Sequence, residues 1–145
     1  MADPISIIGA AGAVVSIIDL LAKTISTISE LRSKWNIADL TVATFEMQLT
    51  GLNMALAEIK RWQDGNSEDP YYQLPMDLDN CLSHCRILIA VIDREIEVLR
   101  TNEGDQLDTA RRIRILFKTQ DLGEAQKMIE HVTNTLGLIL GACNR

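Results

Sequence analysis

The sequence predicts an all-α fold: a helical bundle of four long helices plus one short helix, forming a single domain over residues 1–145. Three observations indicate this class. Apolar residues recur at spacings of three and four in every long segment, as on one face of an α-helix. Hydrophobic residues make up 47% of the chain and aromatic residues only 4%, so aliphatic side chains supply the core. Alternating β-branched runs bounded by turn dipeptides are absent from the sequence, so a strand pair is not expected.

The first predicted helix begins near Asp3, a suitable N-cap, with Pro4 at the first helical position, where its missing N–H costs nothing. Its apolar stripe consists of Ile7, Ala11, Val14, Ile18, Leu21, Ile25 and Ile28. Residues 5–18 are apolar or small at every position, so this part of the helix has no charged face. A helix that is apolar all round is either central in a fold or destined for lipid or a partner.

The second helix is expected to start at Asn36, with Asp39 completing a capping-box-like pattern, and to end at the Asp64-Gly65-Asn66 turn. Its stripe consists of Ala38, Val42, Phe45, Leu49, Leu52, Leu56 and Ile59. An acidic loop over residues 64–80, containing two prolines, leads to the third helix, which Gly104 ends. The stripe of this third helix consists of Leu78, Cys81, Cys85, Leu88, Ile92, Ile96 and Leu99.

A short helix is predicted over residues 106–118, followed by a last helix for which Asp121 and Glu124 form a capping-box-like start. The stripe of the last helix consists of Ala125, Ile129, Val132, Leu136, Ile139 and Cys143.

Net charge and cysteine content limit the possible partners and compartments of the protein. The net charge of −6 disfavours a nucleic-acid partner, which needs a basic face. Three cysteines do not form a disulfide framework, and a reducing compartment is the simpler expectation. The apolar N-terminus has no positive region before it, so it is not predicted to be a secretory signal. Asp19 and Lys23 interrupt it before the 20 or so apolar residues that a transmembrane span needs.

No catalytic, cofactor or metal site is predicted, and no small-molecule substrate. Cys81, His84 and Cys85 suggest a metal-binding site. Both cysteines, however, share their helical face with leucines and isoleucines, and the sequence places no fourth ligand beside them. Core thiols are therefore expected. The two histidines, His84 and His131, lie in no catalytic motif. The acidic loop is expected to be a solvated surface, because its spacing does not match a calcium-binding EF-hand.

One basic run stands out. It contains Arg111, Arg112, Arg114 and Lys118, interleaved with apolar residues. Two interpretations are open for it. It is either the solvated face of an ordinary amphipathic helix, partly paired with Asp108, or a surface for anionic lipid head groups.

The chain resembles a known group of domains. Residues 1–19 (MADPISIIGAAGAVVSIID) are similar to the opening of HeLo-like N-terminal domains on fungal STAND (NOD-like) receptors and ankyrin-repeat proteins. Residues 48–52 (QLTGL), 76–82 (MDLDNCL), 85–89 (CRILI) and the 129–140 helix also resemble that group. The resemblance implies a HeLo-like helical bundle, the N-terminal domain of a longer protein.

Such domains are cytosolic effectors of programmed cell death in fungal heterokaryon incompatibility and innate immunity. The resemblance implies that the chain homo-oligomerises on activation, moves to the plasma membrane and permeabilises it through its N-terminal helix. Carried over to this sequence, the membrane-active element spans residues 5–21, with Asp3 matching the acidic residue near the start of such domains. Asp19 departs from this pattern, because a spanning helix would have to place it in a polar lumen or protonate it. The apolar residues of the element are Ile5, Ile7, Ile8, Val14, Val15, Ile17, Ile18, Leu20 and Leu21.

Two functions therefore remain as hypotheses: a membrane-permeabilising effector, and a non-lytic oligomerisation or adaptor domain that binds a partner helix with the same apolar surface.

Overall fold

The computed structural model describes residues 4–65, 73–101 and 106–143, with side chains for 12–65, 77–99 and 109–142. These residues form five helices: α1 (Pro4–Lys34), α2 (Leu40–Gly65), α3 (Gln73–Thr101), α4 (Gln106–Leu116) and α5 (Gln120–Cys143). The described residues contain no strand, which confirms the predicted class of four long helices and one short helix.

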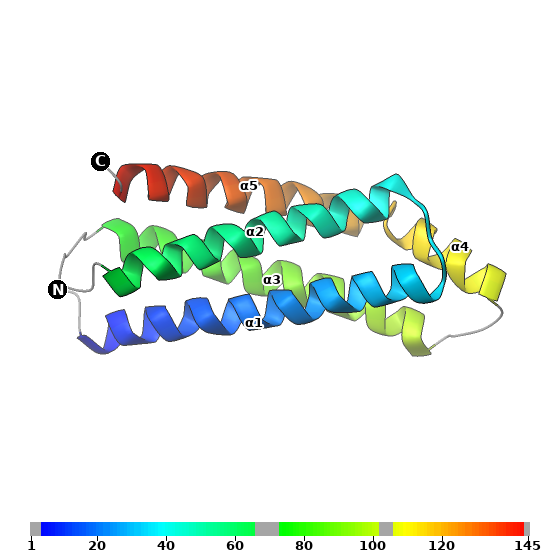
Figure 1. The fold of residues 1–145 in the computed structure, drawn as a ribbon, viewed down its shortest axis with the longest axis horizontal. Coiled ribbons are helices and arrows are strands. Elements are labelled where there is room, and N and C mark those ends of the chain that lie inside the picture. The colour runs from blue at the N-terminus through cyan, green and yellow to red at the C-terminus, as the bar shows by residue number, and fades with distance from the viewer. Residues whose placement is uncertain (1–3, 66–72, 102–105, 144–145) are drawn as a thin grey trace.

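The long helices run alternately up and down the bundle (Figure 1). The main contacts join α1 to α2 and α3, and join α5 to the same two helices, so α1 and α5 stand at opposite corners. The short α4 contacts α3 and lies at the end of the bundle where α1 ends and α2 begins. The first turns of α1 and the last turns of α5 lie at the other end.

The core follows the predicted stripes of α2, α3 and α5 closely. All seven predicted positions of α3 are buried, as are the six of α2 from Val42 to Ile59 and the five of α5 from Ala125 to Ile139. Ala38 is exposed, because it precedes α2, and the side chain of Cys143 lies outside the described ones. Helix α3 also buries Leu82 and Ile89, and it contacts α4 as well as α1 and α5.

The predicted stripe of α1 is partly wrong. Val14, Leu21 and Ile28 are fully buried as expected, but Ile17 is also fully buried, while Ile18 and Ile25 are only partly buried. The four–three spacing allows two neighbouring stripes here, because nearly every residue is apolar. The contacts with α2 and α3 decide between them.

The boundary between α1 and α2 differs from the prediction, and Asn36 does not cap α2. It has a φ of 50° and ends α1 in the left-handed conformation. The Ile37 N–H donates to the Arg32 carbonyl (2.9 Å) and the Asn36 N–H to the Ser33 carbonyl (3.3 Å), which together form a Schellman motif. Asp39 is the N-cap of α2, because its Oδ1 accepts from the Thr41 N–H at 2.8 Å.

Three other helix boundaries also differ from the predicted ones. Helix α3 begins at Gln73, so much of the expected acidic loop is helical and Pro75 falls within the first turn, where a missing N–H is tolerated. Residues 66–72 and the predicted stop at Gly104 lie outside the described residues. Helix α4 ends at Leu116 instead of residue 118. Thr119, not Asp121, caps α5, since its Oγ1 lies 3.5 Å from the Leu122 N–H.

Candidate membrane-active helix and basic surface

Helix α1 is the one described helix that is long and apolar enough, by length and composition, to cross a membrane. The qualifying part is Gly12–Lys34, 23 residues with a mean hydropathy of 1.4. Only 28% of the apolar window in it is buried inside the bundle. This helix therefore combines the hydropathy of a span with a position at the edge of a folded bundle, where one side faces outward.

The structure divides the predicted membrane-active residues into three groups. Val14, Ile17 and Leu21 have no exposed surface and belong to the core. Ile18 is partly buried against that core, while Val15 and Leu20 are each 38% exposed. Ile5, Ile7 and Ile8 lie within α1, but their side chains are outside the described ones.

Polar contacts also hold α1 to its neighbours. The Thr24 hydroxyl, 2% exposed, lies 3.0 Å from Oδ1 of Asp93 on α3 and 3.1 Å from the Leu20 carbonyl. Arg32 Nε donates to Oε2 of Glu46 on α2 at 2.9 Å. Asp19, the charge that interrupts the predicted element, is exposed on the outer side of α1. In the folded bundle it therefore needs no partner.

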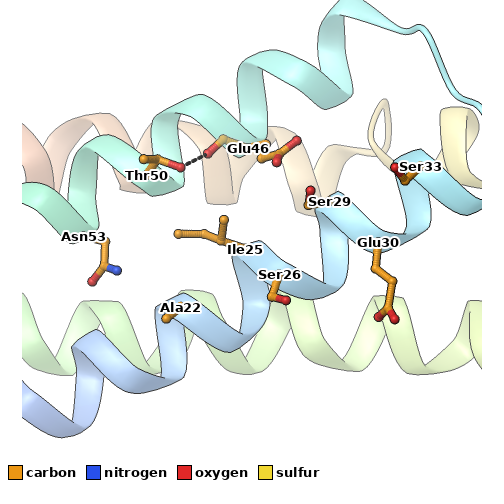
Figure 2. A pocket seen from close by; sticks show the side chains of 9 residues that line it. All are labelled: Ala22, Ile25, Ser26, Ser29, Glu30, Ser33, Glu46, Thr50 and Asn53. Carbon is orange, nitrogen blue, oxygen red and sulfur yellow. Dashed lines mark hydrogen bonds between the residues drawn. The ribbon is translucent and has the colours of Figure 1, made fainter.

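A shallow groove of about 690 Å³ runs between α1 and α2 on the outside of the bundle (Figure 2). Ala22, Ser26, Ser29, Glu30 and Ser33 line it from α1, while Ile25 lies between the two helices. Glu46, Thr50 and Asn53 line it from α2, and the Thr50 hydroxyl donates to the Glu46 carbonyl at 2.9 Å. Small and uncharged side chains predominate along this part of α1.

The basic run lies on and just after α4, and its four cations do not form one cluster. Arg111 and Arg114 are exposed and one turn apart, with Ile115, 58% exposed, beside them. We call these three residues the α4 face. Arg112 is also exposed; it lies about 100° round the helix from Arg111 and about 60° from Ile115, and it has interactions within the molecule.

Lys118 is engaged elsewhere. Its Nζ lies 3.7 Å from Oδ2 of Asp39, so it links the turn after α4 to the start of α2. The hydrogen bond from the Thr41 N–H is the main cause that lowers the pKa of Asp39, and the charge of Lys118 adds to it. The predicted pairing partner Asp108 has a side chain outside the described ones.

Cys81 and Cys85 are core residues, as predicted. Burial raises the pKa of Cys81 and, with the neighbouring Cys81, raises that of Cys85 to about 12, so both thiols stay protonated at neutral pH. His84 and His131 are both exposed. Within the described residues, no three His, Cys, Asp or Glu side chains come together in a way that could hold a metal ion.

One surface feature escaped the sequence reasoning. Leu40, Met47 and Met54 are 82%, 67% and 66% exposed and form an apolar stripe on the outer side of α2. The available signal was their seven-residue spacing, on the side opposite the buried stripe. Leu138 on α5, 75% exposed, is a further isolated example.

Comparison with protein-family models, with curated proteins and with solved structures gives no match for the chain.

Proposed function

We propose that the chain is a membrane-acting effector domain whose active element is α1, working as a HeLo-like cell-death module that homo-oligomerises at the plasma membrane. The supporting observation is that α1, alone among the described helices, has the length and hydropathy of a membrane span. Like α2 and α5, it contacts two of the other helices extensively, so one of its sides faces outward.

The energetics require a trigger for α1 to leave the bundle. Burying an aliphatic side chain is worth about 1.5–3 kcal/mol. Releasing Val14, Ile17, Leu21 and Ile28, all fully buried, would therefore cost roughly 6–12 kcal/mol in this approximation. That is comparable with the whole stability of a typical domain, about 5–15 kcal/mol. The resting protein keeps α1 packed, and insertion into lipid has to offset the loss.

The test separates insertion from folding. Val15 is 38% exposed, so Val15→Glu should leave the melting temperature nearly unchanged. A charged side chain at the centre of an inserted helix costs about 2.5–3.5 kcal/mol, so leakage from liposomes should fall at least tenfold. Leu138→Glu, the same kind of change on α5, is the matched control and should leak as the wild type does. Val14→Glu is unsuitable, since a charge at this fully buried position would unfold the bundle.

Either of two results would contradict the proposal. If Val15→Glu keeps both its melting temperature and wild-type leakage, or if the wild type does not permeabilise liposomes at all, α1 is not a membrane effector.

The alternative function is a non-lytic oligomerisation or adaptor domain. The α2 stripe of Leu40, Met47 and Met54 favours it, because exposed methionines at coiled-coil spacing suit the docking of a partner helix. Met47→Glu with Met54→Glu should then abolish self-association in sedimentation equilibrium, and neither the wild type nor this variant should permeabilise liposomes. If self-association survives this change, the stripe is not the oligomer interface.

A further inference from the structure

We propose that the bundle first meets an anionic lipid bilayer end-on, through the α4 face. This inference rests on the proposed function in that a membrane is the partner. It concerns the first docking step and not the insertion of α1.

Charge distribution supports an end-on contact. Residues 109–120 contain four of the 14 Lys and Arg residues and none of the 20 Asp and Glu residues, with Asp108 and Asp121 at the two borders of this stretch. The rest of the chain therefore holds ten basic and twenty acidic residues and would be repelled by an anionic surface along most of its length. Arg111 and Arg114 are both exposed, and neither makes an ion pair with a side chain that the structure describes.

The apolar member of the α4 face favours lipid over other polyanions. Ile115, 58% exposed, follows Arg114 and lies one helical turn from Arg111. A basic helix face that also carries an apolar side chain suits the head-group region of a bilayer, where both parts are accommodated. Phosphates of a nucleic acid would use the arginines and leave Ile115 in water.

The neighbouring turn provides a second interfacial group. Lys34 Nζ lies 5.2 Å above the centroid of the Trp35 ring, which is partly buried against the core. These two residues stand where α1 ends, and this end of α1 lies at the same end of the bundle as α4 (Figure 1). Tryptophan and lysine side chains are well suited to the membrane–water interface. Trp62, the other tryptophan, lies near the opposite end of α2, a helix of 26 residues that is about 39 Å long. The two tryptophans therefore report on opposite ends of the bundle.

Vesicle cosedimentation tests the docking step. The wild type should bind phosphatidylcholine vesicles containing 30% phosphatidylserine and should bind pure phosphatidylcholine weakly. Arg111→Gln with Arg114→Gln should weaken binding to the anionic vesicles roughly thirtyfold, since each basic residue near such a surface is worth about a factor of five. The matched control, Arg86→Gln with Lys127→Gln, lowers the net charge equally on the sides of α3 and α5 and should have little effect. If the two pairs of substitutions weaken binding to the anionic vesicles equally, the proposal is overturned.

Two further measurements address the lipid and the orientation. Ile115→Ser should weaken vesicle binding several-fold without changing binding of a DNA duplex. If the duplex binds as tightly as the vesicles and Ile115→Ser alters neither, the face is a general polyanion site and the proposal fails. In single-tryptophan variants, Trp62→Phe and Trp35→Phe, brominated lipid should quench Trp35 and not Trp62. Quenching of Trp62 alone would also overturn an end-on approach.

These readouts are independent of permeabilisation. Binding that depends on Arg111 and Arg114 without leakage would refute the proposed function and leave the docking inference standing. If the variants change neither leakage nor vesicle binding, the docking inference is refuted and the proposed function stands.

Discussion

The rings of Phe117 and Phe45 meet edge to face, with centroids 5.3 Å apart and planes at 75°. Phe117 follows α4, whereas Phe45 lies in the first half of α2, and both are almost completely buried. Through this contact the turn between α4 and α5 packs against the first half of α2. The Lys118–Asp39 pair reinforces the same junction.

We expect this aromatic pair to contribute to stability beyond its buried area. Phe117→Ala and Phe45→Ala should each lower the free energy of unfolding by about 3–5 kcal/mol. A double-mutant cycle with Phe→Leu changes should give a coupling energy of about 0.5–1.5 kcal/mol, measured by urea denaturation. Strictly additive losses would mean that the edge-to-face geometry adds nothing to burial.

Asp39 should make stability depend on pH in the acid range. Its pKa is lower in the folded state, so its contribution is complete above the unfolded pKa, about 3.9, and is lost as the pH falls below that value towards the folded pKa. At pH 7, Asp39→Ala should cost about 1 kcal/mol, the usual worth of an N-cap. The difference between wild type and Asp39→Ala should shrink when denaturation is repeated at pH 3. Asp39→Asn is the control, because it keeps an oxygen acceptor for the Thr41 N–H but should lose the pH dependence.

Asn36 should tolerate glycine but not a β-branched residue. Its φ of 50° is natural for glycine and acceptable for asparagine, while other side chains pay about 1–2 kcal/mol there. Asn36→Gly should therefore melt close to the wild type, and Asn36→Val should lose about that amount in a thermal or urea titration. Equal stability of the two variants would contradict the left-handed cap.

The two core thiols should be unreactive until the protein unfolds. In a Cys143→Ser background, Cys81 and Cys85 should react with a thiol reagent at pH 8 only after guanidinium is added, because burial raises both pKa values and blocks access. Rapid stoichiometric modification of the native protein would show that α3 opens locally far more often than its packing indicates.

The sequence predicted the helices well because their periodicity survives in the fold. Outside their apolar stripes, α2, α3 and α5 carry enough polar residues to leave one choice of buried face. That face is the one buried in the structure. In α1 the pattern is degenerate, since Ile17 and Ile18 are equally apolar. Only the neighbouring helices determine that Ile17 is buried completely and Ile18 partly.

Caps and surfaces were predicted less well, for physical reasons. Asn36 and Asp39 are both good N-cap residues, and the choice depends on the left-handed turn between them, which residue type alone does not reveal. The basic run was predicted as one group of four cations. The structure separates Lys118 from the three arginines, because α4 ends before Lys118, which then reaches Asp39.

The five-residue turn between Lys34 and Leu40 is the link through which α1 joins α2. If Asn36 left its left-handed conformation, α1 would swing out as a unit and expose a channel between α2 and α3. That channel is complementary to α1 of any second molecule, since both have the same sequence. Two molecules that exchanged their first helices would rebuild both bundles with the native contacts, and only the two turns would differ. Reciprocal exchange would therefore be nearly neutral in contact energy, and its extent would rise with protein concentration.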